Sequence, residues 1–289
     1  CETLTHAVVK RAREHGTPVL ILPVARTVSG HAAAELGQVG ALLAAGAHGL
    51  VLVTETQHNA RAQEAVDLDA HYSVPYVLIA WTHYYDGKQG SSDCRQKSFE
   101  MADFFVRKAE KLDDSYPDTY ILMGFLFLWQ KQFEQALTAG RKAIALGPNN
   151  AEAHMIMAHI LRFIGEFEEA AQMVAKALRL EPYYPSFYLT ELAMCHYYTG
   201  RYREAVASAK DFLLMAEERG DSELLYFGYT SLAMNYVRLN KLEDARLAAK
   251  RVLDYFPEYS LEWDRKASFY KYPEHLEQQH ADLRKAGIS

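Results

Sequence analysis

Residues 117–182 read PDTYILMGFLFLWQKQFEQALTAGRKAIALGP followed by NNAEAHMIMAHILRFIGEFEEAAQMVAKALRLEP, and the second segment repeats the pattern of the first. Equivalent positions carry small residues 34 positions apart: Gly124 and Ala158, Ala136 and Ala170, Ala143 and Ala177. Each segment closes on a proline, Pro148 or Pro182. Small residues let two helices approach closely, and a proline ends the second helix because it lacks the backbone N–H. The stretch therefore predicts two consecutive copies of one helix pair.

A 34-residue period with this arrangement resembles the tetratricopeptide (TPR) family, which implies an α-α superhelix. Three further units fit the pattern less regularly, at Ala80 and Ala102, at Ala193 and Ala205, and at Ala233 and Ala245. In the unit of Ala193 and Ala205 we expect the second helix to continue to residue 219. One helix pair cannot bury its apolar face alone, so the units must stack, and a final helix at 274–286 would cap the last one. We predict a mainly α fold with a TPR domain of about five units over residues 67–289.

The ends of this domain point to a subtype. Residues 86–93, DGKQGSSD, follow Ala80-Trp81 and predict an inserted loop. This insert, together with Lys271-Tyr272-Pro273 and the ending LRKAG at 283–287, resembles the C-terminal TPR region of bacterial class III adenylate/guanylate cyclase-type regulators. The loop contains neither a GxxxxGK[ST] motif nor the closing Glu of an EF-hand, so neither a phosphate nor a calcium site is expected.

Residues 1–66 follow a different pattern. Two short apolar runs, at 19–22 and 50–53, alternate with helical segments at 2–15 and 32–45. This order predicts parallel pairing and a short α/β segment. The runs TPV at 17–19, LPV at 22–24 and AGAHGL at 45–50 resemble the middle of an aldolase/citrate-lyase-type (β/α)8 barrel. Two strands cannot close a barrel of roughly 250 residues, so we transfer no catalytic residue and expect His48 and Glu55 to be loop side chains.

Composition narrows the class of protein. The 289 residues are 49% hydrophobic and 24% charged, which is typical of a globular chain with a sizeable core. Charges of both signs are interleaved around a net charge of −6, so no basic stripe indicates nucleic-acid binding. No apolar run approaches the ~20 residues of a membrane span. Cys1, Cys94 and Cys195 form no CxxC pattern, so we expect no zinc site and predict a cytoplasmic protein. We expect the chain, which begins without Met, to be a fragment.

The repeats show no catalytic arrangement. Cys195 and His196 are adjacent on a predicted helix and point about 100° apart, so they do not face each other. His154 and His159 are five positions apart, a poor spacing for one metal. We therefore predict no catalytic residue, no metal and no cofactor.

The first helices of the units predict a concave groove instead. Its expected lining is rich in aromatic residues, Met and Arg, the types enriched in protein interfaces. These residues are Trp81, Tyr84, Tyr85, Phe125, Trp129, His159, Arg162, Phe163, Met194, Tyr197, Tyr198, Met234 and Arg238. The same stripe is also typical of a core, and both interpretations stay open. The Lys/Asn set that clamps a C-terminal carboxylate is absent, so an acidic C-terminal peptide is not the expected ligand.

We predict a non-enzymatic protein-interaction module that binds a protein or peptide in this groove. The cyclase resemblance implies the regulatory arm of a bacterial signalling protein. Two alternatives stay open: part of a metal-dependent aldolase or lyase fused to TPRs, and a self-packed TPR domain that forms homo-oligomers.

Overall fold

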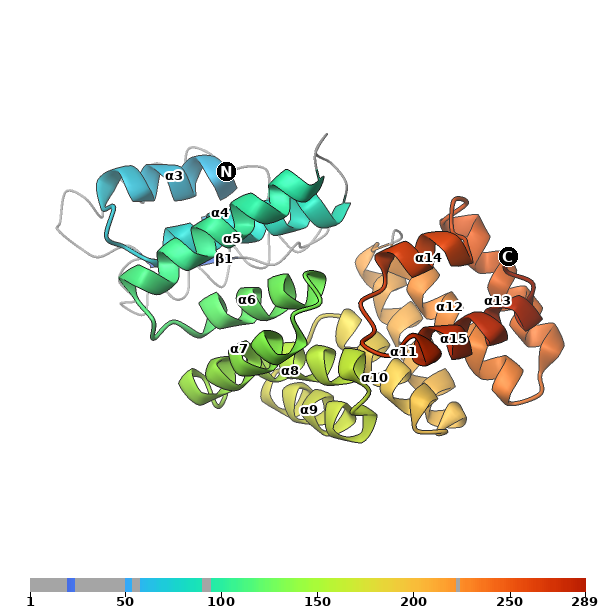
Figure 1. Cartoon of the computed structure of the whole chain (residues 1–289). Helices are drawn as coiled ribbons and strands as arrows, with labels where there is room; N and C mark the ends of the chain where they lie inside the picture. Colours follow the sequence, from blue (N-terminus) through green and yellow to red (C-terminus); the bar gives the residue numbers. More distant parts are fainter. Residues whose placement is uncertain (1–19, 24–49, 54–57, 90–94, 222–223) are drawn as a thin grey trace. The chain divides into compact units, whose positions relative to one another are not determined.

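The computed structural model describes residues 20–23, 50–53, 58–89, 95–221 and 224–289 (Figure 1). The chain divides into two compact units, residues 1–114 and 115–289. The domain boundary that the sequence predicts between residues 66 and 67 is not tested by this division and stays a prediction.

The described residues of unit 1 form two strands and three helices. Strands β1 (Leu20–Pro23) and β2 (Leu50–Val53) pair in parallel, with Leu20 opposite Leu50. They are followed by α3 (His58–Leu68), α4 (Val74–Gln89) and α5 (Arg95–Leu112). The helices predicted at 2–15 and 32–45, and the loop residues His48 and Glu55, lie outside the described residues. The α/β segment as a whole, and its barrel resemblance, therefore stay predictions.

The predicted loop at 86–93 is wrong over its first half, because α4 continues through Gln89. Gly87 explains the continuation. A Cβ atom at Gly87 would lie 3.1 Å from the ring of Phe99 on α5, so the missing side chain lets the two helices approach closely. The ring of Tyr84, one turn earlier, also contacts Phe99, with 5.8 Å between ring centroids. The glycine is thus a packing residue of a helix pair rather than the start of a loop.

Unit 2 consists of four helix pairs and two further helices. The pairs are α6 (Pro117–Trp129) with α7 (Phe133–Leu146), α8 (Ala151–Ile164) with α9 (Phe167–Leu180), α10 (Phe187–Tyr198) with α11 (Tyr202–Arg219), and α12 (Leu225–Arg238) with α13 (Leu242–Tyr255). Each pair packs on the next through α7 and α8, α9 and α10, and α11 and α12. In the third pair, the predicted continuation of the second helix to Arg219 is confirmed.

The turn inside each pair has one backbone conformation. Lys131, Gly165, Gly200 and Asn240 all have positive φ angles, between 58° and 93°. At each turn a backbone N–H beyond the helix donates to a carbonyl in its last turn, for example Glu166 to Leu161 at 2.9 Å. This left-handed ending satisfies carbonyl groups that the helix leaves free, and it starts the second helix in the same direction every time.

Small residues fix the packing within and between pairs. Ala136, Ala170, Ala205 and Ala245, at the start of the four second helices, are all 0% exposed. Gly124 lies where α6 meets α8, and a Cβ there would be 2.9 Å from Ile156. These are the positions that the 34-residue period marked.

The chain ends in two short helices. α14 (Leu261–Ala267) was not predicted; it starts at Ser260, whose hydroxyl accepts from the Trp263 N–H at 3.2 Å. α15 (Pro273–Ala286) packs on α12 and α13, as predicted for a cap. Leu283, Ala286 and Ile288 are 0%, 2% and 3% exposed in the same core.

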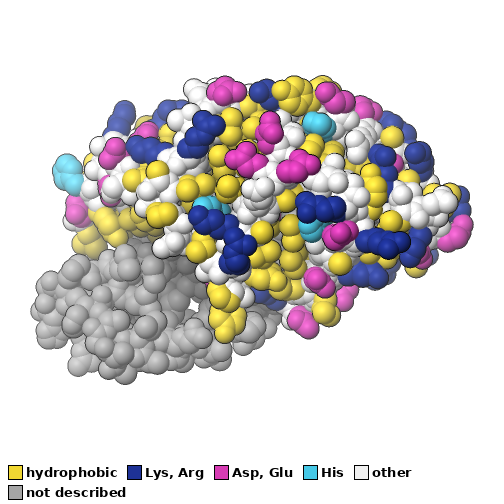
Figure 2. Space-filling model, turned by 90° about the horizontal axis from the view of Figure 1, so that it is seen from below, with side chains coloured by type: hydrophobic (Ala, Val, Ile, Leu, Met, Phe, Trp, Pro, Cys, Tyr) yellow, Lys and Arg dark blue, Asp and Glu magenta, His cyan; other side chains and the backbone are white. Residues whose placement is uncertain are grey.

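The surface is mixed in character. Figure 2 shows Lys and Arg side chains interspersed with Asp, Glu and hydrophobic side chains over the visible face of the described residues. In the described part of the chain, no helix combines the length and the apolar character that crossing a membrane requires.

Candidate functional site

Five of the predicted groove residues contact the C-terminal segment of the same chain. They are Arg162 and Phe163 on α8, Tyr197 and Tyr198 on α10, and Arg238 on α12. The segment consists of residues 268–272, which we call the strap, and α15. The face formed by the first helices α8, α10 and α12, which we call the inner face, therefore already holds a stretch of polypeptide.

Arg162 is the centre of the first contact. Its side chain is buried, and its Nε donates to Glu191 Oε1 at 2.5 Å while Nη1 donates to the phenol oxygen of Tyr270 at 2.7 Å. Glu191 also pairs with His159 at 3.0 Å. Burial alone would raise the pKa of Glu191, but the charges of Arg162 and His159 lower it to about 2. The inner face thus holds a buried ion pair with a guanidinium donor directed at the strap.

The strap is bound through backbone as well as side chains. The Lys271 N–H donates to the Phe163 carbonyl at 2.8 Å, near the end of α8. The rings of Phe163 and Tyr270 lie 4.8 Å apart. On the other side of Tyr270, Gln279 Nε2 donates to the phenol oxygens of both Tyr270 and Tyr198, at 2.7 and 2.5 Å.

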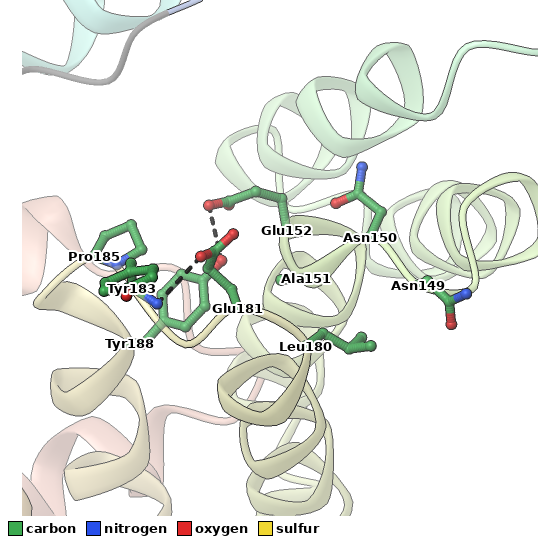
Figure 3. Close-up of a pocket in the computed structure, with 9 residues that line it drawn as sticks. All are labelled: Asn149, Asn150, Ala151, Glu152, Leu180, Glu181, Tyr183, Pro185 and Tyr188. Carbon is green, nitrogen blue, oxygen red and sulfur yellow. Dashed lines mark hydrogen bonds between the residues drawn. The ribbon is translucent and has the colours of Figure 1, made fainter. Parts of the chain in front are cut away.

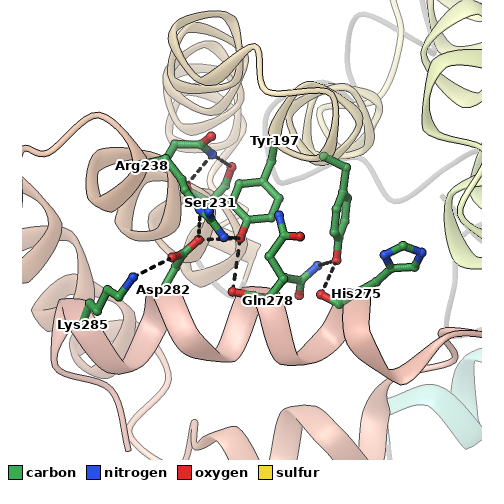
Figure 4. A network of polar contacts seen from close by, with 10 residues as sticks. Tyr197, Ser231, Arg238, His275, Gln278, Asp282 and Lys285 are labelled. Carbon is green, nitrogen blue, oxygen red and sulfur yellow. Dashed lines mark hydrogen bonds and ion pairs between the residues drawn. The ribbon is translucent and has the colours of Figure 1, made fainter.

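Tyr197 and Arg238 make the second contact. Figure 4 shows both side chains pointing toward α15 from α10 and α12. Tyr197 donates to Asp282 Oδ2 at 2.5 Å, and Arg238 Nε donates to the same oxygen. Burial and the Asp282 carboxylate raise the pKa of Tyr197. Next to this network, Tyr198 donates to the His275 carbonyl at 2.9 Å.

The α6 end of the predicted groove carries a cluster of rings. His159 lies 5.5 Å from Phe125 and 4.9 Å from Phe163, measured between centroids. Phe125, Trp129 and His159 are partly exposed. Aromatic side chains are therefore partly exposed at this end of the predicted groove, beside the strap.

Two groove predictions need correction. Met234 is 1% exposed and belongs to the core of α10–α13, so it lines no open groove. Tyr197 is 0% exposed beneath α15. Met194 is partly buried against the same core. The physical reason is that α15, which the sequence placed only as an end cap, covers this part of the inner face.

Trp81, Tyr84 and Tyr85 lie in unit 1 and form a cluster of their own. Trp81 is 5.6 Å from both tyrosine rings. Tyr84 is buried, which raises its pKa, whereas Tyr85 is 49% exposed. A groove that spans all thirteen predicted residues stays a prediction.

Sequence reasoning missed the residues that bind from the C-terminal side: Tyr270, His275, Gln279 and Asp282. The spacing of the last three, at 275, 279 and 282, places them on one face of a helix. That pattern of polar residues opposite an apolar face is the signal from which a docked helix could have been predicted.

A second surface feature lies where α8 and α10 begin. A pocket of about 470 Å³ is lined by Asn149, Asn150, Ala151, Glu152, Leu180, Glu181, Tyr183, Pro185 and Tyr188 (Figure 3). Tyr188 donates to Glu152 Oε1 at 2.8 Å, and burial raises the pKa of Glu152. Asn150 caps α8 by accepting from the Ala153 N–H at 3.2 Å. Both of these hydrogen bonds have a structural role in the repeats.

Three residues that the sequence analysis considered for catalysis or metal binding are buried or paired within the repeats. Cys195 is 0% exposed, and burial raises the pKa of its thiol. His154 is 1% exposed and its Nε2 lies 2.9 Å from the Pro148 carbonyl, whereas His159 pairs with Glu191. No three His, Cys, Asp or Glu side chains gather as a metal site in the ranges that the structure describes.

A family model for the tetratricopeptide repeat matches residues 151–184, which include α8 and α9. None of the curated protein sequences matches the chain.

Among solved structures, a chain of the APC/C hetero-tetramer Cut9-Hcn1 superposes with a TM-score of 0.60 at 14% identity, over 81% of this chain and 44% of that one. This chain thus spans less than half the length of that relative. The type IV pilus biogenesis factor PilW matches with a TM-score of 0.52 at 16% identity, over 72% of this chain and 89% of that one. PilF of Pseudomonas aeruginosa also matches with a TM-score of 0.52 at 16% identity, over 81% and 96%. The family model thus matches one repeat of the chain, and the helical repeat fold predicted from the 34-residue period is confirmed.

Proposed function

We propose that the chain is a non-enzymatic protein-interaction scaffold that binds a partner polypeptide on the inner face of its repeats. The observation that carries this proposal is the strap. The inner face receives a non-helical stretch of polypeptide through a backbone hydrogen bond at Phe163 and a side-chain donor at Arg162. A surface that binds one peptide segment in this way has the donors and aromatic rings to bind another.

The structural relatives support this proposal at the level of the fold. One of them is part of a hetero-tetramer, and another is a pilus biogenesis factor. Repeats of this kind stack into extended surfaces, and such surfaces suit the assembly of other proteins.

The finer parts of the proposal rest on sequence resemblance. We propose that the partner lies in a bacterial signalling pathway, as the likeness to cyclase-associated TPR regions implies, and that the protein works in the cytoplasm. Residues 1–66 would then be an α/β segment joined to the TPR domain.

Site-specific photocrosslinking tests the binding face. A benzoylphenylalanine is placed at Trp129, at the partly exposed α6 end of the predicted groove beside the inner face, and crosslinked proteins are identified by mass spectrometry. The matched control is the same group at Leu247 on α13, which is 63% exposed. We expect one partner to crosslink from position 129 and not from 247, and Trp129→Ala to weaken its purified complex about thirtyfold. Equal crosslinking from both positions, or unchanged affinity, would overturn the proposal.

A self-packed domain is the second candidate. The burial of Tyr197 and Met234, at 0% and 1% exposed, favours it, because the chain's own helix already covers that part of the inner face. In that case Trp129→Ala would lower the melting temperature and leave affinity per folded molecule unchanged.

A further inference from the structure

The strap and α15 are attached by different forces. α15 is anchored in the core by Leu283, Ala286 and Ile288. In the strap, Lys271 and Tyr272 are exposed, and Tyr270 is held by hydrogen bonds and ring contacts. The strap can therefore leave the inner face while α15 remains as the cap.

The site that receives Tyr270 has walls that do not depend on the strap. The Arg162 guanidinium is fixed by Glu191 and lies 4.0 Å above the ring of Phe163. Tyr198 is stacked on Phe167, with 4.0 Å between ring centroids. A guanidinium donor and two fixed aromatic walls remain in place when the strap is absent, which lowers the entropic cost of binding a new segment.

We propose that the inner face carries a binding site for a tyrosine in a non-helical segment of a partner, and that the strap occupies this site as an internal competitor. This inference rests on the proposed function and names the partner's chemistry. The partner segment presents a tyrosine to Arg162 and, at the next residue, a backbone N–H to the Phe163 carbonyl. The next residue is therefore not proline, which has no N–H.

The contacts discriminate among side chains. The Tyr270 oxygen accepts from two donors, Arg162 and Gln279, and phenylalanine cannot accept from either. A phosphotyrosine would place its negative charge beside Glu191, which already uses the Arg162 guanidinium. The backbone selects a non-helical segment, because residues 268–270 are in no helix or strand and the chain bends at Lys271 and Tyr272.

The strap also lowers the apparent affinity of the site for a free peptide. A tethered ligand acts at an effective concentration in the millimolar range, so the intact strap masks the site from a peptide at micromolar concentration. Removing the Tyr270 side chain leaves Arg162, Phe163 and Tyr198 in place and empties the site between them.

Fluorescence anisotropy with the full chain tests this inference. The probe is a fluorescein-labelled peptide of residues 266–273, KASFYKYP. Tyr270→Ala should bind it at least tenfold more tightly than the parent chain. Tyr272→Ala is the matched control in the same strap, at a side chain that is 44% exposed, and should bind like the parent. A second peptide with Phe in place of the central tyrosine should bind Tyr270→Ala roughly tenfold more weakly, the effect of losing a hydrogen bond to a charged group.

Circular dichroism establishes that each variant is folded. If Tyr270→Ala unfolds, Tyr270→Phe keeps the ring and loses only the hydroxyl, and it should still bind the tyrosine peptide more tightly than the parent does. Equal affinity of the parent and the folded variant, or equal affinity for the Tyr and Phe peptides, overturns the tyrosine site. If a partner nevertheless crosslinks from position 129 alone, the scaffold function stands and only the tyrosine site fails. If both experiments fail, the proposed function fails with it.

Discussion

The phenol oxygen of Tyr197 on α10 lies 2.5 Å from Oδ2 of Asp282 on α15, although 85 positions separate the two residues. Arg238 on α12 donates to the same carboxylate oxygen. The Asp282 side chain is 1% exposed, and a buried carboxylate is tolerated only with such partners. The last helix is therefore held to two different repeats by one charged network as well as by apolar packing.

Removal of the Asp282 carboxylate should destabilise the fold strongly. In Asp282→Ala, the Arg238 Nε loses its acceptor and the buried Tyr197 hydroxyl keeps only the Gln278 carbonyl at 3.3 Å, so we expect a loss of ~3–5 kcal/mol in the free energy of unfolding by urea. Lys285 supplies the control, because its side chain is 64% exposed and its amino group lies 3.9 Å from the same carboxylate. Lys285→Ala should change stability by less than about 1 kcal/mol. Similar stabilities for the two variants would contradict the role of the network.

Because of the buried ion pair of Arg162 and Glu191, the free energy of unfolding should decrease as the pH falls. The pKa of Glu191 is lowered from 4.5 to about 2, so its contribution is complete above pH 4.5 and is lost as the pH falls toward 2. The contribution is on the order of 3 kcal/mol. Urea unfolding of the parent at pH 6 and pH 3 should show a larger loss than in the paired variant Arg162→Met with Glu191→Gln, which carries no charge to titrate there. An equal loss in both proteins would show that this pair is not the titrating element.

The sequence predicted the repeats well because their spacing is local and recurs. Small residues such as Ala136 and Ala170, and the glycine at 165, determine the helix pair within one unit. The strap could not be predicted in the same way, because Tyr270 meets Arg162 across 108 positions. No periodicity relates these two residues. The predicted groove includes side chains on α8 and α10 that contact the C-terminal segment, but the prediction did not include that segment. Whether these side chains bind a partner stays a prediction.

Overpacking tests the contact between the helices of one pair. Ala170 is 0% exposed on α9, so Ala170→Leu should cost ~1–3 kcal/mol. Ala145→Leu on α7, at an exposed position, adds the same side chain where there is room and should stay within about 0.5 kcal/mol of the parent. Thermal melts of the two variants that coincide would contradict the placement of Ala170.

Neutralising Glu152 should stabilise the protein at neutral pH. Burial raises the pKa of Glu152, so its contribution to stability is present below about pH 4.5 and is lost as the pH rises through the raised pKa. Glu152→Gln keeps an acceptor for the Tyr188 hydroxyl and removes the charge. The variant should melt higher than the parent at pH 7, and the difference should shrink near pH 4.5. Glu168→Gln, at an exposed position of α9, is the control and should show no such trend.

Gly165 and Gly200 have the same backbone conformation, but only Gly165 lies close to the C-terminal segment. Substituting each one therefore distinguishes the effect of backbone strain from the effect of a contact with that segment. Gly165 and Gly200 have φ angles of 93° and 74°, so alanine at either position costs roughly 1–2 kcal/mol of backbone strain. Only Gly165 faces the C-terminal segment: a Cβ there would lie 2.9 Å from His275 Nε2, whereas nothing lies within 4 Å of a Cβ at Gly200. Both variants should therefore lose similar stability, but only Gly165→Ala should raise deuterium uptake in the strap and the first turn of α15. Hydrogen exchange followed by mass spectrometry measures this directly. Uptake that rises equally in both variants would mean that the strap responds to global stability, and its contact with the α8–α9 turn would then carry no specific role.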